Sequence, residues 1–571
     1  MTLRRLLFGT VVTATMALLL WLAGMALAPG GLDTLKTAIL ALFVITMPWM
    51  VIGFWNALIG FLIMRFAADP VAAVFPASAS VRPDAIIAAR TAVLVCIRNE
   101  PPQRALRNLA PLIAGLAADN AASQFHVFIL SDTDVPDVVA EEDRLFSGLI
   151  ETWRDRLTIT YRRRVNNIGF KAGNIWEFCE RWGHDYEIAI TLDADSVMPA
   201  AAVLRLVRVM QADPRLGIVQ ALVVGMPATS AFARIFQFGM RFGMRSYTIG
   251  SAWWQGDCGP YWGHNAAVRL KPFIEACELP PLPSGKHILS HDQIEAVLMR
   301  RAGYEVRVLP EEDLGWEENP PTLIEFLRRD LRWCQGNMQY WRFLVMPGLR
   351  PVSRCQLAIA ILMFVSSPAW VALLVLGTLL AARGQGNVLD ASYGWLLLIV
   401  ILFMWFAPKI ATVTDVLLRP GLRRAYGGTF RIVVSVTIEV VFFILLSPVQ
   451  WISHTLQLAK LAWGGGIGWG AQARDDHAVS FGHAVQWLWP HTLLGVISIG
   501  ALLFRNSAAI PVMFLVAGGP MLSIPFAVLT ARRSAGDILL HFGLCALPEE
   551  NVPPEILRDL AVPAVVLRGH A

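Results

Sequence analysis

Long apolar runs flank a more polar central segment of the 571-residue chain. Near the start, the runs from Leu6 to Ala28 and from Leu35 to Phe66 are each long enough to cross a membrane as a helix, and Pro48 lies inside the second. Further apolar runs follow the polar segment at about 357–379, 395–418, 432–446, 485–504 and 510–529. The pattern predicts a polytopic α-helical membrane protein.

The stretch 432–463 fits more than one arrangement. Its first half is apolar, it is interrupted at Ser447-Pro448, and its second half is more amphipathic. Two short crossings, one crossing, or a helix on the membrane surface are all compatible with this pattern. Arg532 and Arg533 after the last apolar run indicate a cytoplasmic tail, so we expect an even number of crossings.

Basic residues also orient the start of the chain. Arg4 and Arg5 precede the first apolar run, and cytoplasmic loops are enriched in Lys and Arg. Two crossings then return the chain to the cytoplasm. We therefore expect the polar segment to face the cytoplasm, where nucleotide sugars and other phosphorylated metabolites are available.

Within the polar segment, short runs rich in β-branched residues alternate with helical patterns. The expected strands are Thr91–Ile97, Phe125–Leu130, Leu157–Tyr161, a strand ending at Asp193, and Leu216–Leu222. Strands that alternate with helices indicate a largely parallel sheet with helices on both faces.

Three of these strands end in a polar cluster that contains a carboxylate: Glu100, Asp132, and the pair Asp193 and Asp195. Since the carboxyl ends of parallel strands meet at one edge of a sheet, we expect these residues to share one cleft. Two carboxylates one residue apart suit Mg²⁺ or Mn²⁺, which would bring a diphosphate with it. Asp is also common in turns, but the convergence of three strand ends favours the metal site.

Aromatic residues gather after the last of these strands, at Trp253-Trp254 and at Tyr261–Asn265. Aromatic faces beside polar donors suit a sugar, because the rings pack on its C–H face while its hydroxyls form hydrogen bonds. An aromatic belt where the domain meets the membrane would give the same composition. The sequence leaves both interpretations open.

A helix is expected to begin near Ser290-His291-Asp292 and to run to Arg301. Ser290 followed three residues later by Gln293 fits a capping box, which places Asp292 in the first turn. The helix dipole favours an ionised carboxylate there, and such a carboxylate can serve as a general base. A carboxylate that only stabilises the helix start is the simpler alternative.

The polar segment closes with an amphipathic helix expected from about Thr322 to Phe343. Arg329 and Arg332 share one face of it, and Trp333 lies beside Arg332. Arginine forks suit a leaving diphosphate, and the tryptophan offers a stacking surface for a sugar. A membrane-surface helix whose arginines meet lipid phosphates is an alternative compatible with the first.

The composition of the chain argues against several classes of protein. The mean hydropathy is +0.52, and only 16% of the residues are charged. The net charge of +5 comes from arginine clusters at segment ends and does not indicate nucleic-acid binding. The seven cysteines form no Cys-x-x-Cys pair, which argues against a zinc site or a disulfide framework and for a reducing compartment.

These motifs, taken in order, resemble a known family. Asp132, Lys171-Ala172-Gly173-Asn174, Asp193-Ala194-Asp195 and Arg332-Trp333 are similar to the pattern of family 2 glycosyltransferases with the GT-A fold, within membrane synthases of the cellulose and hyaluronan type. Two positions depart from that pattern. Ser290-His291-Asp292 stands in place of Thr-Glu-Asp, and Arg329 stands in place of Gln.

The departures resemble a narrower group, the osmoregulated periplasmic glucan glucosyltransferase H family. The similar segments, which extend from about residue 91 to Pro554, are 180–183, 192–198, 261–265, 289–292, 298–303 and 332–337. The resemblance implies a polytopic membrane protein with a cytoplasmic α/β GT-A domain, built on a mixed, mostly parallel sheet flanked by helices. The expected divisions are membrane helices in 1–68, the GT-A domain with an interfacial helix in 69–350, a second membrane region in 351–531, and a cytoplasmic tail in 532–571.

The resemblance also implies roles for individual residues. The donor would be bound by Asp132, Lys171, Asp193, Arg329 and Arg332, and the metal, Mg²⁺ or Mn²⁺, by Asp193 and Asp195. Asp292 would deprotonate the acceptor hydroxyl for an inverting attack. The acceptor would contact Trp333, Trp262, His264 and His291. A loop near 464–483 that includes Gln472, Arg474 and Asp475 would close over the nucleotide.

By the same resemblance, the protein lies in the bacterial inner membrane and polymerises glucose from UDP-glucose into a linear β-1,2-glucan that it exports to the periplasm. Its partners would be membrane lipids, the growing glucan, a periplasmic protein that modifies the glucan and, in some members, an acyl carrier protein. The alternatives are a synthase of another β-glycan such as cellulose, chitin or hyaluronan, a glycosyltransferase that acts on a lipid, and a transporter or scaffold without transferase activity.

Overall fold

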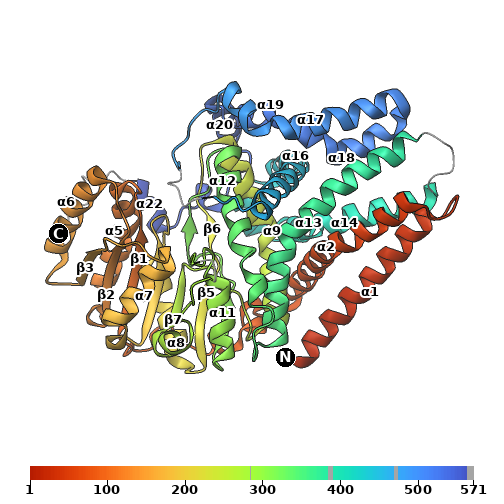
Figure 1. Ribbon diagram of the computed structural model, residues 1–571. Helices are drawn as coiled ribbons and strands as arrows, with labels where there is room; N and C mark the ends of the chain where they lie inside the picture. Colours follow the sequence, from red (N-terminus) through yellow and green to blue (C-terminus); the bar gives the residue numbers. More distant parts are fainter. Residues whose placement is uncertain (283–284, 384–389, 468–472, 562–571) are drawn as a thin grey trace.

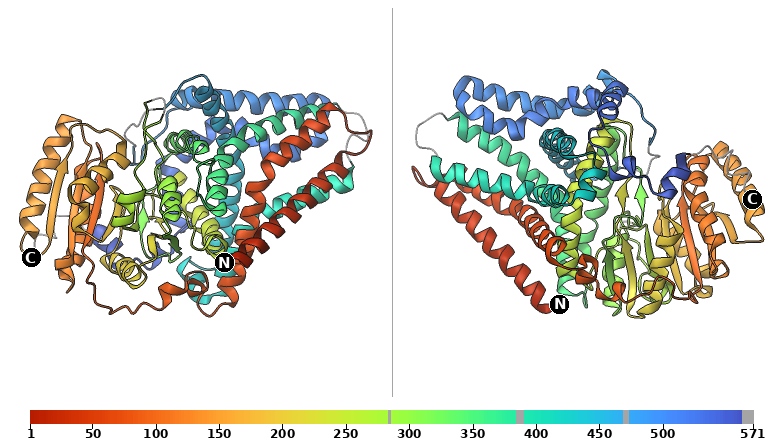
Figure 2. Two further views of the ribbon diagram at one scale, coloured as in Figure 1. Left: turned by 60° about the horizontal axis from the view of Figure 1, so that its bottom comes forward. Right: turned by 180° about the vertical axis from the view of Figure 1, so that it is seen from behind.

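The computed structural model describes residues 1–282, 285–383, 390–467 and 473–561. Figure 1 shows two parts side by side: an α/β lobe built on a twisted sheet, and a bundle of long helices. The two further views in Figure 2 show the same division. The arrangement confirms a mostly parallel sheet with flanking helices attached to long apolar helices.

The lobe contains a seven-stranded sheet in the order β3-β2-β1-β4-β7-β5-β8. The strands are β1 (Thr91–Ile97), β2 (Phe125–Ser131), β3 (Thr158–Arg163), β4 (Ile188–Asp193), β5 (Leu216–Ala221), β7 (Ala266–Arg269) and β8 (Glu305–Leu309). Strand β7 runs antiparallel to its neighbours β4 and β5, and the other pairings are parallel. A separate two-stranded sheet joins β6 (Val224–Gly225) and β9 (Trp316–Glu317).

Helices cover both faces of the large sheet, which explains why its central strands are almost continuously apolar. One face packs on α5 (Pro102–Ala118), α6 (Pro136–Trp153) and α8 (Ala200–Ala212) through residues such as Leu112 and Val203. The other packs on α7 (Phe170–Trp182), α10 (Leu270–Ala276) and α11 (Asp292–Arg301) through residues such as Phe178 and Ile294. The shorter helices of the chain are α3 (Pro70–Val74), α4 (Pro76–Ala79), α15 (Pro420–Ala425) and α20 to α22 (Arg533–Phe542, Pro548–Asn551 and Glu555–Ala561).

Six helices of the described residues are long and apolar enough to cross a membrane, or up to seven if one bent pair is counted as a span. The six are α1 (Thr2–Leu27), α2 (Thr34–Phe66), α13 (Pro351–Ala382), α14 (Ala391–Leu418), α16 (Thr429–Ala462) and α17 (Phe481–Arg505). The bent pair joins Ser507–Met521, which contains α18 (Ile510–Met521), to α19 (Ser523–Thr530) at an angle of 61°.

Helix α16 is continuous through Pro448, so the possibility of two short crossings in 432–463 is wrong. It contacts two helices of the lobe, α9 (Ala231–Gln255) and α12 (Leu323–Asn337). Its first half packs on α9, where the rings of Phe442 and Phe232 lie 5.3 Å apart. Its second half contacts α12, where His454 bonds to Asp330. Contacts with the lobe along both halves favour a helix that lies against the lobe.

The lobe is attached to the bundle mainly through α9, which crosses α2 closely. A Cβ placed on Gly250 would lie 1.9 Å from the carbonyl oxygen of Asn56, so the two backbones can touch only because residue 250 lacks a side chain. Trp254 Nε1 donates to Asn56 Oδ1 at 2.9 Å, and the ring of Phe8 stacks on Trp254. These contacts agree with the interpretation of Trp253-Trp254 as residues at the junction with the membrane helices.

The end of the chain returns to the lobe. Arg234 of α9 pairs with Glu550 at 2.7 Å, and Arg241 pairs with Glu549 at 3.0 Å. Ile556 is buried in a cluster with Trp316. The start of the tail therefore lies on the side of the membrane helices that carries the lobe, which is the side expected from its arginines.

Candidate active site

The carboxyl ends of β1, β2 and β4 form one edge of the sheet, as the strand pattern predicts. Cys96 of β1 is in register with Asp193 of β4, and the backbone N–H of Asp132 donates to Ile97 O at 2.9 Å. Burial raises the pKa of Glu100 to about 7, and the charges that act on it include those of Asp195 and Arg474. The structure therefore brings Glu100, Asp132, Asp193 and Asp195 to one edge.

Lys171 connects the first residues of α7 with this edge. Its Nζ pairs with Asp193 and donates to Gly263 O at 2.8 Å. Burial alone would lower the pKa of the amine and raise that of the carboxyl, but their mutual attraction outweighs it. The pKa of Lys171 is raised and that of Asp193 is lowered, so both groups stay charged at neutral pH.

Gly263 is the point where the segments of Lys171 and of Asp292 meet. A Cβ placed there would lie 3.4 Å from Asp292 Cβ, 3.7 Å from Lys171 Nζ and 3.8 Å from His291 Cε1. The backbone at Gly263 has φ +81°, a conformation that glycine adopts without strain. Lys171, His291 and Asp292 thus surround a single turn between the Asp193 carboxylate and the start of α11.

Asp195 pairs with a residue from a distant part of the chain. It is buried, and its carboxylate accepts from the guanidinium of Arg474, which precedes α17. The neighbouring Asp475 pairs with Arg104 of α5, and Asp476 accepts from the hydroxyl of Thr229. The segment 474–476 is therefore fixed over the edge of the sheet at three points. Gln472, which we also expected in this loop, lies outside the described residues.

Asp193 and Asp195 offer the hard oxygen donors that Mg²⁺ and Mn²⁺ prefer, so their chemistry is compatible with a divalent metal. Lys171 and Arg474 pair with these two carboxylates, and a metal would take the place of those cations. No group of three or more His, Cys, Asp or Glu side chains suited to a metal occurs among the residues that the structure describes. The donor set fits a metal whose remaining ligands come from a bound diphosphate.

Asp132 is held by Arg164, a partner that the sequence analysis did not identify. The pairing is bidentate, with Nε to Oδ1 at 2.5 Å and Nη2 to Oδ2 at 2.7 Å, and both residues are buried. Arg164 also donates to the backbone oxygens of Ile168 and Phe170, just before the Lys-Ala-Gly-Asn segment. The pair therefore fixes the chain that carries Lys171 to the end of β2.

Asp292 is the first residue of α11, as expected for a carboxylate in the first turn. The predicted capping box is wrong: the residue at the N-cap is His291, with no side-chain cap bond. Ser290 instead lies against α12, where a Cβ on Gly336 would come within 2.1 Å of its hydroxyl oxygen. Burial raises the pKa of Asp292, and the charges of His291 and Lys171 oppose this rise.

Helix α12 ends at Asn337, followed by a short 3₁₀ turn at Tyr340–Arg342 in place of the longer helix that we predicted. The guanidinium of Arg329 lies 4.8 Å from the ring centre of Trp333, and its Nη2 donates to Asn319 Oδ1 at 3.1 Å. Its Nε is buried and has no hydrogen-bond partner within the described chain. Such a group can donate to an anion.

Two arginines concentrate positive charge on this helix. Burial, together with the neighbouring charge of Arg329, lowers the pKa of Arg332 to about 10, so it remains protonated at neutral pH. Trp333 is 47% exposed and can offer a ring face. This arrangement suits a diphosphate beside a sugar.

Trp262 and His264 lie between the strand ends and α12. Gln220 of β5 accepts from the backbone N–H of Trp262 at 2.8 Å. His264 Nε2 lies 3.7 Å from Glu317 Oε2, and burial raises the pKa of Glu317 while His264 and Arg329 oppose the rise. Glu317 was not predicted as a site residue, because its two-residue strand leaves no periodic signal in the sequence.

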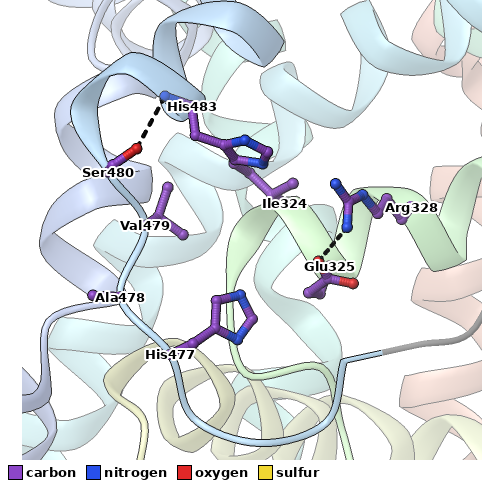
Figure 3. A pocket seen from close by; sticks show the side chains of 8 residues that line it. All are labelled: Ile324, Glu325, Arg328, His477, Ala478, Val479, Ser480 and His483. Carbon is purple, nitrogen blue, oxygen red and sulfur yellow. Dashed lines mark hydrogen bonds and ion pairs between the residues drawn. The ribbon is translucent and has the colours of Figure 1, made fainter.

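A cavity of about 350 Å³ lies apart from these carboxylates, between the first turn of α12 and the segment that leads into α17 (Figure 3). Figure 3 shows Arg328 paired with Glu325 on one side and His477 and His483 on the other. The remaining lining residues are Ile324, Ala478, Val479 and Ser480. Arg328 thus faces away from Arg329, its neighbour in sequence.

Comparison with known proteins identifies two overlapping family matches. The model described as "Glycosyl transferase family 2" matches residues 92–276, and the model described as "Glycosyl transferase family group 2" matches residues 188–408. The first covers the carboxylate edge through β7. The second continues through α12 into the helices of the bundle.

Similar curated proteins cover nearly the whole chain. Glucans biosynthesis glucosyltransferase H of Xylella fastidiosa is 34% identical over 97% of this chain and 89% of its own length. The protein of the same name from Xanthomonas euvesicatoria is 34% identical over 95% of this chain and 87% of its own length. That of Pseudomonas paraeruginosa is 35% identical over 94% of this chain but only 64% of its own length.

Solved structures give a weaker likeness. A mannosyltransferase from Pyrobaculum calidifontis in complex with GDP-Man and Mn²⁺ has a TM-score of 0.44 and 17% identity, and the match covers 67% of this chain and 98% of that chain. TarS of S. aureus has a TM-score of 0.30 and 11% identity, covering 57% of this chain and 54% of that chain. At these scores, the ligands of those proteins carry no argument about this one.

Proposed function

We propose, because the chain belongs to the glucans biosynthesis glucosyltransferase H family, that it polymerises glucose from UDP-glucose into a linear β-1,2-glucan and exports the polymer across the inner membrane. The chain is a family 2 glycosyltransferase with membrane helices. The proposal includes UDP-glucose as the donor, the β-1,2 linkage, the export of the polymer and the cytoplasmic orientation of the lobe.

One observation carries the transfer chemistry: Lys171, His291 and Asp292 converge on Gly263, next to the Asp193–Asp195 pair. A sugar nucleotide bound at the carboxyl edge would present its diphosphate to the aspartates and its sugar to Asp292. Lys171 links Asp193 to the Gly263 turn, which Asp292 also approaches. This proximity would place the reacting C1 and the leaving diphosphate within one site.

Asp292 acts as the general base. Burial raises the pKa of its carboxyl, and the positive charges of His291 and Lys171 limit this rise and favour the ionised form. It takes the proton from the acceptor hydroxyl as the oxygen attacks C1 of the donor glucose, and the C1–O bond to UDP breaks. The sugar inverts its configuration because the new bond forms opposite the one that breaks.

Arg329 and Arg332 hold the departing diphosphate. The free Nε of Arg329 provides a donor that needs no rearrangement of an existing hydrogen bond. A divalent metal at Asp193 and Asp195, when bound, would offset charge on the leaving phosphates. Fixed donors in a partly buried site favour the charge that develops as UDP leaves.

The acceptor end of the glucan is proposed to lie among Trp333, Trp262 and His264. Trp333 exposes a ring next to Arg329, and His264 lies beside Glu317. Ring faces and fixed polar groups bind the apolar and hydroxyl surfaces of a sugar together. Helix α16 contacts α12 through the hydrogen bond between His454 and Asp330, so the helix that carries Trp333 lies against a long apolar helix.

Inside-out membrane vesicles test synthesis and export together. Vesicles that contain the protein are supplied with Mg²⁺ and radiolabelled UDP-glucose on the outside, and polymer is assayed with and without detergent. Polymer that resists an added glucan hydrolase until detergent opens the vesicles supports both steps. Label recovered only in an organic-solvent extract would contradict polymerisation and indicate transfer to a lipid.

A further inference from the structure

His291 and Glu295 form a buried pair directly beside the catalytic base. They lie four residues apart on the first turns of α11, so their side chains share one face of the helix. His291 Nδ1 lies 2.8 Å from Glu295 Oε2, and their side chains are 7% and 3% exposed. The other edge of the imidazole faces the Gly263 turn, with Asp292 and Lys171 around it.

The charges that face this imidazole come from two helices. Asp292 and Glu295 lie on its own helix, and Lys171 lies on α7. The remaining titratable groups near Asp292 and Glu295 are Tyr261, Tyr340, Cys179 and Cys277. Burial raises the pKa of all four, so they are uncharged at neutral pH.

We propose that Glu295 is a positioning residue for glucosyl transfer: through a buried hydrogen bond, its carboxylate fixes the imidazole of His291 beside Asp292. The inference rests on the proposed function, in which Asp292 takes the proton of the acceptor. Glu295 itself does not touch the reacting atoms. It acts through the Nδ1–H that His291 donates to its carboxylate.

The charge balance explains why such a residue is needed. Two acidic side chains, Asp292 and Glu295, and one basic side chain, Lys171, act on the imidazole of His291. A neutral imidazole there would leave two carboxylates against one amine that is already shared with Asp193. Charging His291 balances the two carboxylates, and the hydrogen bond to Glu295 directs its remaining N–H away from that carboxylate.

The direction of the pKa shift agrees with this arrangement. Burial alone would lower the pKa of His291, but the carboxylate of Glu295 outweighs burial and raises it. The imidazolium therefore persists to a higher pH than in an ordinary histidine. We expect the rate to fall at the pH where His291 loses this proton.

A substitution of Glu295 by Gln tests the proposal, because Gln keeps the size and the hydrogen bond but removes the charge. Without that charge, His291 loses its proton at a lower pH and Asp292 gains its proton at a lower pH. The whole pH profile of kcat should move down by about one unit, since one unit is a tenfold change in protonation. We expect a loss of up to about tenfold at pH 8 and of less than about threefold at pH 6.

Two control variants make the result specific. Glu295→Asp retains the charge and should keep the wild-type profile, with a smaller loss of rate. Glu278→Gln removes an exposed carboxylate after α10 and should change nothing. The KM for UDP-glucose should change less than about twofold in all three variants, because the donor contacts on Lys171 and Asp193 are untouched.

The proposal is overturned if Glu295→Gln lowers kcat equally at every pH, or leaves the pH profile where it is. A uniform loss would assign Glu295 a structural role only. Failure of the underlying function looks different, because the wild-type protein itself would then make no polymer from UDP-glucose at any pH. UDP binding, measured by calorimetry, verifies that each variant is folded.

Discussion

At the scale of single residues, the site is organised by opposite charges that pair across distant segments. Lys171 faces Asp193, Arg474 faces Asp195, and Arg164 faces Asp132. For Asp193, the charge of Lys171 outweighs burial and lowers the pKa of the carboxyl. The three ion pairs hold the edge of the sheet together.

Replacing the base tests the assignment of Asp292. Asp292→Asn keeps the size of the side chain but cannot accept the acceptor proton, so polymer formation should fall by about 10²- to 10⁴-fold. UDP binding should persist within about threefold, since the diphosphate contacts lie elsewhere. The exposed Asp185→Asn serves as the control. Initial rates with radiolabelled donor and calorimetry with UDP measure the two effects, and retention of more than a tenth of the rate would contradict the assignment.

Two neighbouring arginines on α12, Arg328 and Arg329, allow a test variant and a matched control. Arg329 faces the site with a free Nε, whereas Arg328 pairs with Glu325 beside the cavity of Figure 3. Lysine keeps the charge but loses the planar fork, so Arg329→Lys should lower kcat/KM for UDP-glucose by about tenfold. Arg328→Lys should stay within about twofold. Similar losses of kcat/KM in both variants would contradict a specific role for the guanidinium of Arg329 and indicate a general effect on α12.

Sequence alone identified many of the charged residues of the site but not how they pair. Lys171, Asp193, Asp195 and Asp292 stand at strand ends and helix starts, where motif and topology both place them. Arg164, the partner of Asp132, follows β3, and the pairing of β3 with β2 brings it to that aspartate. The prediction that Ser290 caps α11 was wrong, because α12 packs against that serine through Gly336.

At the scale of elements, α12, which carries Arg329 and Arg332, packs against Ser290, just before Asp292 at the start of α11. It depends on Gly336, where a Cβ would come within 2.1 Å of Ser290 Oγ. No other residue type allows the helix to approach Ser290 this closely.

Replacing Gly336 by a residue with a side chain should move α12 away from the start of α11. Gly336→Ala should cost about 1–3 kcal/mol of stability through overpacking, and it should lower kcat by about tenfold or more as Arg329 and Arg332 move away from Asp292. Gly243→Ala, at a helical position with open space around it, is the control. Melting temperature and initial rate are measured together. Equal rates for the two variants would mean that the α11–α12 spacing does not limit the reaction.

The elements themselves were largely predictable. Strands β1 to β5 match their apolar runs to within a residue or two, because burial on both faces leaves a continuous signal. The sequence did not predict that α16 is one continuous helix, because a proline inside a membrane helix does not have to break it. The two-residue strands β6 and β9 were missed because so short a segment has no periodicity.

At the scale of the whole molecule, the close crossing of α9 and α2 attaches the lobe to the helix bundle. The pattern of apolar residues gives no sign of which helices meet, because lipid-facing and helix-facing surfaces are equally apolar. The contact is built on small residues instead, with Gly250 on one helix and Gly60 on the other. The tail adds two ion pairs to the same helix, through Glu549 and Glu550.

A side chain added where α9 crosses α2 should weaken the attachment of the lobe to the bundle without changing the candidate active site. Gly250→Ala should lower the melting temperature in detergent, at a cost of about 1–3 kcal/mol, since its methyl group would meet the backbone of Asn56. Gly53→Ala, with nothing near its Cβ position, should not. A melting curve of Gly250→Ala that superimposes on that of the wild type would contradict the role of this contact.

The most direct test of the central claim is the product made by the purified protein from UDP-glucose. With Mg²⁺ present, the labelled product is digested in parallel with a β-1,2-glucan hydrolase and with a cellulase. The account predicts a polymer that the first enzyme degrades and the second leaves intact, and no polymer from Asp292→Asn. A polymer cut by the cellulase would contradict the proposed linkage, and the absence of polymer from the wild-type protein would contradict the proposed synthesis.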